Sequence, residues 1–390
     1  MKRKKLLSLH GSAWLILVLL VALLALPGVS REVTAAGPIK IGHIDTFSGI
    51  MAVTGQSGKR GAILAETEIN EKGGVLGRKL EVIYADNESN AGRAATVAKR
   101  LIQRDKVCAI SAGSMTSVNV AMAKVASKEK IPYIGDGAGG ILTQPLNPWI
   151  FRNYWRVEDG AKAYLLAARD IGLKKVAVFY IQNTWGLDSL EYCKREAPKM
   201  GMQVVAAETC EAGASDVTVQ AGKFRDAGAD VIVQFQYEPQ NAALYRAKRR
   251  LEYKAPTIQL TNILDAMVRL VGKEAVEGTL VVGELDLSRP EVAEVYRRGQ
   301  KRFGKDVMKF DCGVALGYGN LMLFAKAIKK AGSDNPAAIR DALETFTGEP
   351  SFMGNKDARI RWSSTCHDGM VAEDFARYWY RNGEYIPITK

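Results

Sequence analysis

Residues 39–44 read Ile-Lys-Ile-Gly-His-Ile, a short β-branched run that is typical of a buried strand. An apolar stripe at helical spacing follows between Gly55 and Lys72, and Gly73-Gly74 ends that helix. The next strand is predicted at residues 80–84. A strand, a helix and a second strand at this spacing predict a βαβ unit with parallel strands. The stretch therefore indicates an α/β fold.

The same alternation of strand and helix continues along the chain and restarts after Tyr154. Two such series in tandem predict two doubly wound lobes, each with a binding edge at the carboxyl ends of its strands. The second helix is predicted to open at Ser89 or Asn90, and Asn335 to cap the last helix ahead of Pro336. Further strands are predicted at residues 107–111, 131–134, 176–180, 203–207, 231–235 and 257–260, and further helices at 116–130, 160–171, 291–303, 314–330 and 336–346.

The first residues resemble a secretory leader. Residues 1–5 are positively charged at four positions, and the apolar run Ala13–Leu26 is shorter than the about 20 residues that span a membrane. Small residues at 33–36 offer a cleavage site, so residues 1–36 are predicted to be a signal peptide. The mature protein is then periplasmic or extracellular, and the alternative is an uncleaved membrane anchor.

Charge and cysteine usage exclude some classes of protein. The formal net charge of +12 falls to +8 without the leader, and the remaining charge is spread along the chain without a basic patch interleaved with aromatic residues, so no nucleic acid is expected as a partner. Five cysteines in an oxidising compartment permit one or two disulfides, but the sequence does not give their pairing. Cys108 lies in an apolar stretch and is expected to be a buried free thiol.

Signs of catalysis are absent. The sequence contains no HExxH motif, no GxSxG elbow and no paired cysteine ligands, so no catalytic residue, no metal and no cofactor is expected. His367-Asp368 is predicted to lie in a polar turn. Gly299–Lys305 has the spacing of a phosphate loop, but it follows a helix instead of a strand and is interpreted as a helix end. The protein is therefore not expected to be an enzyme.

Several short motifs occur in an order and spacing that resemble one family. They resemble the leucine/isoleucine/valine-binding proteins of bacterial ABC importers, and the match extends over nearly all of the chain after the leader. The motifs that carry the resemblance are Ile39–Gly42, Phe47-Ser48-Gly49, Thr54-Gly55-Gln56, Gly61-Ala62, Ile69-Asn70, Gly73–Gly77, Leu80, Gly113–Ser117, Ile131-Pro132, Phe151-Arg152, Trp185-Gly186 and Ala229–Ile232.

The resemblance implies the type I periplasmic-binding fold, in which two Rossmann-like lobes are joined by three hinge crossings and close on a solute. The crossings are expected near residues 152–156, 286–289 and 352–362. Lobe one would take residues 37–154 plus 288–356, and lobe two residues 155–287 plus 357–390. The implied function is capture of a small amino acid or related carboxylate for an ABC importer, with its membrane permease as partner.

The resemblance also implies a binding site. In the family a hydroxyl and backbone N–H groups of lobe one hold the solute carboxylate, and aromatic side chains of lobe two form the walls. A helix start and a glycine-rich turn both favour an anion, although helix capping and a simple tight turn are the alternatives. The matching positions are Thr116 and Ser117, Ala138, Gly139 and Gly140 in the segment 137–140, and the aromatic residues Trp185 and Tyr237.

Two departures from the family leave the solute open. Thr261 or Asn262 stands where amino-acid binders carry a carboxylate for the ammonium group, and Thr54 stands at an early aromatic position. A non-amino-acid organic acid, such as an aromatic carboxylate, is therefore an alternative solute, and a ligand-sensing periplasmic receptor is an alternative function. The carboxylates that could replace the missing one are Asp136, Glu238 and Asp265.

Overall fold

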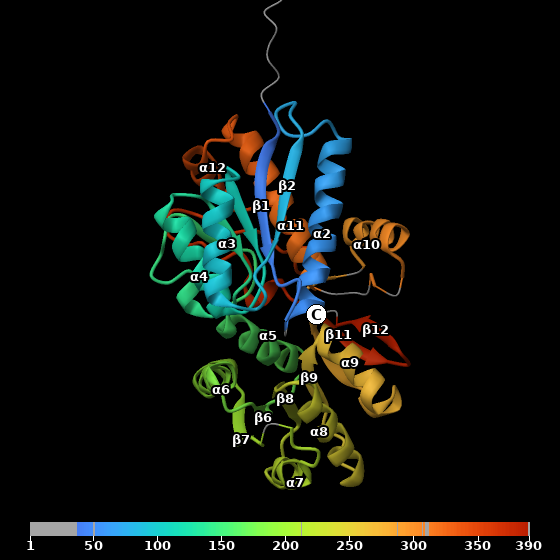
Figure 1. Ribbon diagram of the computed structural model, residues 1–390. Coiled ribbons are helices and arrows are strands. Elements are labelled where there is room, and N and C mark those ends of the chain that lie inside the picture. Colours follow the sequence, from blue (N-terminus) through green and yellow to red (C-terminus); the bar gives the residue numbers. More distant parts are fainter. Residues whose placement is uncertain are drawn as a thin grey trace, which may run out of the picture. The chain divides into compact units, whose positions relative to one another are not determined.

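The computed structural model describes residues 37–388, apart from residues 50, 212, 287, 306 and 309–311, and at 261–263 and 265–266 it describes the backbone alone. Residues 38–390 form one compact unit that contains two β-sheets with helices packed on them (Figure 1). The first sheet has the order β2-β1-β3-β4-β5 and is parallel throughout. Its strands are β1 (Ile39–Asp45), β2 (Leu80–Asp86), β3 (Ala109–Ala112), β4 (Tyr133–Gly135) and β5 (Ile150–Arg152).

Helices cover both faces of the first sheet. Helices α3 (Ala91–Gln103) and α4 (Thr116–Lys128) share one apolar cluster with it, and α2 (Ala52–Glu71) and α11 (Cys312–Ala331) share the other. Glycines let α2 and α11 approach closely, since a Cβ on Gly61 would lie 1.9 Å from the Val314 carbonyl oxygen. The late helix α11 therefore packs on the first sheet together with α2.

The second sheet has the order β12-β11-β10-β9-β8-β6-β7, in which β11 and β12 are antiparallel additions. On β6, Val176 and Val178 are buried on one face, and Ala177 and Phe179 on the other. Burial on both faces is what a parallel sheet between helices requires. The strands are β6 (Lys175–Tyr180), β7 (Gln203–Glu208), β8 (Val231–Phe235), β9 (Thr257–Leu260), β10 (Thr279–Gly283), β11 (Ala376–Arg381) and β12 (Glu384–Pro387); the helices are α5 (Val157–Asp170), α6 (Thr184–Glu196), α7 (Thr218–Asp226), α8 (Glu238–Arg250) and α9 (Thr261–Val271).

The chain passes between the two sheets three times. The first crossing joins β5 to α5, the second joins β10 to α10 (Pro290–Phe303), and the third leads from α12 (Pro336–Leu343) to β11. Leu285 forms a parallel bridge with Gly354, so the second and third crossings run side by side. The buried carboxylate of Glu284 accepts hydrogen bonds from Tyr154 Oη (2.5 Å) and Trp155 Nε1 (2.6 Å) of the first crossing. The crossings are therefore tied to one another.

Most element boundaries agree with the sequence to within a few residues. The strands at 231–235 and 257–260 have the predicted bounds, and the Asn90 and Asn335 side chains cap their helices. The last helix ends at Leu343, not at residue 346 as predicted, and α2 begins at Ala52, ahead of the predicted Gly55. The prediction gave no strand for β5, because three residues are too few to show a period.

Three smaller predictions concern cysteines, the phosphate-loop spacing and the leader. None of the five cysteines forms a disulfide, and burial raises the pKa of Cys108 to about 12, as suits an inert buried thiol. The residues of the phosphate-loop spacing end α10, as predicted, because Gly304 is its C-cap. No helix in the described part of the chain is long and apolar enough to cross a membrane, and the predicted signal peptide lies outside the described residues.

The boundary between the lobes near residue 357 stays a prediction. Strands β11 and β12 belong to the second sheet. However, the Trp362 ring lies 5.1 Å from that of Phe151 on β5, and His367 stacks on the same ring at 4.0 Å. We therefore propose that residues up to about 368 go with the first lobe.

Candidate functional site

The predicted site residues all follow the carboxyl ends of parallel strands. In the first sheet they come after β1, β3 and β4, and in the second after β6, β8 and β9. Strands β3 and β4 are neighbours, as are β6 and β8, so each sheet brings its residues to one edge. The carboxyl edge is where open α/β sheets bind their ligands.

Thr116 connects two loops of the first lobe. Its Oγ1 accepts a hydrogen bond from the Gly139 N–H at 3.1 Å, and a Cβ on Gly139 would lie 2.7 Å from the Thr116 methyl group. The N-cap of α4 is Met115, without a side-chain cap, so the alternative that Thr116 caps the helix is wrong. Because Oγ1 accepts from Gly139, the Thr116 hydroxyl proton remains able to donate. Ser117, which is exposed, follows in the first turn, where a helix leaves N–H groups without intrahelical partners.

Arg152 fixes the glycine-rich segment 137–140 through its backbone carbonyl groups. Its guanidinium is fully buried and donates to the Gly137 carbonyl (2.8 Å) and the Gly139 carbonyl (3.1 Å). Its Nε also donates to Asp368 Oδ1 at 2.9 Å. Burial lowers the pKa of Arg152 and the Asp368 carboxylate opposes that shift. With its carbonyls held by Arg152, the segment is more constrained than a simple tight turn.

Ser114 and Asp136 form a polar network beside Thr116. The Ser114 N–H and the Asn119 side chain both donate to Asp136 Oδ1 at 3.0 Å, and the Ser114 hydroxyl contacts Thr46 Oγ1 at 2.8 Å. Ser114 has φ +152°, a conformation that is uncommon for residues other than glycine. Burial raises the pKa of Asp136 to about 7, and the two hydrogen bonds oppose that shift. Backbone strain and a perturbed carboxyl group are typical of functional sites.

Trp185 and Tyr237 come together at the edge of the second sheet. Their rings stack with centroids 5.7 Å apart, and Phe235 meets Trp185 edge-on at 6.3 Å. The two residues stand at the starts of helices α6 and α8, where Asn183 caps α6 by accepting from the Gly186 N–H at 3.0 Å. Trp185 therefore lies in the first turn of a helix. Tyr237 is 50% exposed, so its ring is open to contact.

Trp185 also borders a small cavity of about 10 Å³. Trp155, Tyr164 and Phe235 are among its lining residues. The Tyr164 and Phe235 rings stack at 5.0 Å, so the wall behind Trp185 is aromatic. The second lobe thus offers an apolar surface that can cover a ring or an alkyl group.

The other predicted residues differ in what the structure says of them. Thr54 is half-buried in the first turn of α2. Thr261 and Asn262 open α9, but their side chains, like that of Asp265, lie outside the described residues. Glu238 is exposed at the start of α8, next to Tyr237.

The prediction did not pair Arg152 with Asp368, although Arg152 Nε and Asp368 Oδ1 lie within hydrogen-bonding distance. The two residues are 216 positions apart, and Asp368 was interpreted as part of a polar turn. That turn exists, with a bridge between Ser363 and Cys366, but His367 is buried and its Nδ1–H donates to the Ile150 carbonyl at 2.8 Å. The one feature of the sequence that could have indicated a buried ion pair is the position of Arg152 at the end of an apolar run.

The comparison with known protein families decides the class. Residues 38–375 match the family described as periplasmic binding protein, which is most of the chain. The chain belongs to the periplasmic binding protein family. This is a family of binding proteins, not of enzymes, and its members are exported. The match confirms the family and the fold class that the sequence motifs implied.

Curated relatives of this periplasmic binding protein cover nearly its full length. An amino acid binding protein of Pseudomonas aeruginosa is 24% identical over 372 residues, covering 94% of this chain and 96% of the relative. A leucine-, isoleucine-, valine-, threonine- and alanine-binding protein of the same species is 23% identical, covering 87% and 92%.

Solved structures show the same fold. A branched-chain amino acid ABC transporter protein from Thermus thermophilus with bound valine has a TM-score of 0.75 at 17% identity, covering 91% of this chain and 96% of that one. A branched-chain amino acid transporter substrate-binding protein from Streptococcus pneumoniae, in complex with isoleucine, has a TM-score of 0.72 at 20% identity, covering 90% and 100%.

Proposed function

We propose that this periplasmic binding protein is the solute receptor of an ABC importer and captures a small amino acid or a related carboxylate by closure of its two lobes. Its partner is the membrane permease of that importer. The leader, about residues 1–36, is removed on export. Relatives whose names state an amino-acid ligand support the solute class.

The observation that carries the proposal is the Thr116–Gly139 contact. It brings a hydroxyl that can donate and the first turn of α4 to one point at the carboxyl edge of the first sheet. A helix start favours negative charge, and hydrogen bonds to a carboxylate are stronger than those between neutral groups. We assign this point to the carboxylate of the solute.

The stacked rings of Trp185 and Tyr237 supply the second half of the proposed site. They offer no charge to a solute, and Tyr237 is half-exposed. Covering such a surface with an alkyl or aromatic group gains about 25 cal/mol per Å². The solute therefore has an apolar part next to its carboxylate.

Asp136 is the residue that we assign to an ammonium group. Asp136 accepts a hydrogen bond from the Ser114 N–H, close to the point that we assign to the solute carboxylate. The other two candidate carboxylates give no such contact, because Glu238 is exposed on α8 and the side chain of Asp265 is not described. The Asp136 Oδ1 accepts two hydrogen bonds, and Oδ2 remains for a cation. This assignment favours an amino acid over an organic acid without an amine.

A binding screen tests the solute class. Melting of the exported protein is followed with single amino acids and with organic acids, because a ligand at 100 times its Kd adds about 2.7 kcal/mol of stability. Calorimetry then compares the best solute with its methyl ester and with its des-amino acid. We expect both to bind more weakly than the parent. Equal binding of acid and ester would contradict the carboxylate assignment, and equal binding of the des-amino acid would contradict the role of Asp136.

Two further measurements test export and closure. Intact-mass analysis of exported protein is expected to show loss of about residues 1–36, and retention of that segment would contradict cleavage. Small-angle scattering is expected to give a smaller radius of gyration with saturating solute. An unchanged radius would contradict closure without affecting the solute assignment.

A further inference from the structure

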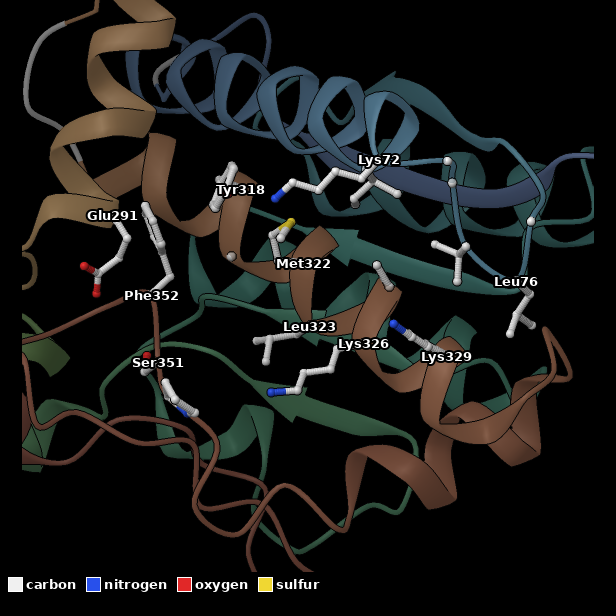
Figure 2. Close-up of a pocket in the computed structure, with 18 of the residues that line it drawn as sticks. Lys72, Leu76, Glu291, Tyr318, Met322, Leu323, Lys326, Lys329, Ser351 and Phe352 are labelled. Atoms are coloured by element: carbon white, nitrogen blue, oxygen red, sulfur yellow. The ribbon is translucent and has the colours of Figure 1, made fainter.

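A second pocket lies away from the proposed solute site. It has a volume of about 760 Å³ and is bounded by the end of α2, by α11 and by the second and third crossings (Figure 2). Its loop, residues 73–77, precedes β2, whereas Thr116 and Gly139 follow β3 and β4. Because the strands are parallel, the loop and the proposed solute site lie at opposite edges of the sheet.

The pocket combines an apolar floor with cationic side chains. Figure 2 shows Met322 and Leu323 of α11 on the floor, with Phe352 of the third crossing at one end. The amines of three lysines point toward this floor from two helices (Figure 2). These lysines are Lys72 at the end of α2 and Lys326 and Lys329 on α11.

One of these lysines is free to bind an anion. Lys72 pairs with Glu68 and Lys326 with Glu349, whereas no ion pair involves Lys329 within the described part of the chain. The acidic lining residue Glu291 is held by Arg289, with Nη2 to Oε1 at 2.8 Å, and Figure 2 shows it at the far end of the pocket. The charge facing the floor is therefore positive.

Leu76 adds a wall at the cost of backbone strain. It has φ +54°, a left-handed conformation that is unfavourable for a bulky residue, and its side chain is 42% exposed. Val75 and Arg78 exchange both backbone hydrogen bonds around Leu76 and Gly77, and a two-residue turn of this kind requires positive φ at both central positions. The turn therefore accounts for the backbone, and the exposure of the apolar side chain is the feature that a ligand would explain.

We propose that this pocket is a second binding site, specific for a free amphipathic organic anion with an apolar body and a carboxylate or sulfonate head. The body lies on Met322, Leu323 and Leu76, and the head contacts Lys329. The volume lies within the about 300–1,000 Å³ of small-molecule sites. The site is independent of the proposed solute site and does not rest on the proposed function.

Decanoate is the probe that tests the proposal, by calorimetry on the exported protein. We expect one decanoate per chain, with weak or no binding of acetate, which lacks the body, and of decyltrimethylammonium, which has the opposite charge. Lys329→Glu is expected to weaken decanoate binding at least about tenfold, or about 1.4 kcal/mol. Lys330→Glu makes the same charge change on the same helix, outside the pocket lining, and is expected to leave binding within about twofold of wild type.

Leu76→Gly tests the apolar wall without a risk to folding, because glycine accepts the positive φ at this position. We expect it to weaken decanoate binding several-fold and to leave the melting temperature unchanged or higher. Trp185→Ala, which alters the proposed solute site, is expected to leave decanoate binding unchanged.

Four outcomes would overturn the proposal. They are absence of decanoate binding, equal losses for Lys329→Glu and Lys330→Glu, loss of decanoate binding in Trp185→Ala, and binding of decyltrimethylammonium as tight as that of decanoate. Sedimentation with phosphatidylglycerol vesicles, sensitive to Lys329→Glu, would assign the pocket to a membrane surface and would also overturn the free-anion assignment.

Discussion

The two halves of the proposed solute site are built in opposite ways. In the first lobe, polar groups are fixed by other polar groups, as when Thr116 accepts from Gly139 and Arg152 holds the glycine segment. In the second lobe, Trp185 and Tyr237 are held by ring stacking and leave part of their surface open. The reason is that buried polar groups need partners before a solute arrives, whereas an aromatic face needs none. The first half is thus preorganised for charge, and the second is open to a range of apolar shapes.

Replacing Arg152 is expected to have the largest effect, because it removes the support of the polar half. Arg152→Met removes the buried cation beside the Asp368 carboxylate, which keeps the Thr143 hydroxyl at 2.8 Å and Arg156 at 3.7 Å. Breaking a buried pair typically costs about 3–5 kcal/mol, and the loss here should lie near the lower end of that range because of the remaining partners. Arg169, which pairs with Asp170 and is 43% exposed, gives the control, since Arg169→Met should cost less than about 1 kcal/mol. Urea unfolding measures both. Equal losses of unfolding free energy in the two variants would show that the buried Arg152–Asp368 pair stabilises the fold no more than an exposed pair does.

Replacing Thr116 tests the polar half directly. Thr116→Val removes the hydroxyl and leaves the Gly139 N–H without its acceptor, so solute affinity should fall by about 10- to 100-fold, as expected for a lost hydrogen bond to a charged group. Thr116→Ser keeps the hydroxyl and should bind within a few-fold of wild type. Calorimetry with the identified solute decides. A valine variant that binds like the serine variant would remove Thr116 from the site.

Replacing Trp185 tests the aromatic half with a smaller expected effect. If the solute covers about 50 Å² of the ring, Trp185→Ala should lose about 1.3 kcal/mol, or roughly tenfold in affinity. The loss should be the same for the acid and its ester, since the ring carries no charge. Trp379 on β11 is also half-buried, and Trp379→Ala is the control. A loss of affinity for the acid but not for the ester would contradict the assignment of the apolar contact to the second lobe and of the carboxylate contact to the first.

The smallest expected effect concerns pH and Asp136. Because burial raises its pKa to about 7, the protonated form is favoured in the folded protein. Its contribution to stability is complete below the usual carboxyl pKa near 4 and is lost as the pH rises through about 7. Asp136→Asn cannot ionise and keeps an Oδ1 acceptor, so it should melt about 1–3 °C higher than wild type at pH 8.5, and this advantage should be clearly smaller at pH 5.

Exposed Asp188→Asn on α6 serves as the control for that pH comparison and should show no such pH-dependent difference. A variant at Asp136 whose advantage is the same at both pH values would contradict a raised pKa in the folded state.

Much of the fold was predictable because its signals are local. A β-branched run such as Val231–Phe235 identifies a buried strand, and Asn335 before Pro336 identifies a helix start. The order of such elements in two series predicted two parallel sheets. The site residues were implied by the family resemblance, and the order of the elements adds only that residues after a parallel strand lie at the carboxyl edge. Short strands such as β5 gave too little pattern.

By itself, the sequence determined the α/β class, the two sheets and the edge at which each candidate residue lies, since those depend on periodicity and on neighbours along the chain. Only the tertiary structure paired Arg152 with Asp368, joined Thr116 to Gly139 and stacked Trp185 on Tyr237. It also brought Lys72 to the same pocket as Lys329. Each of these contacts joins residues that are distant in the chain, and the free energy of such contacts depends on burial and geometry that no local pattern records.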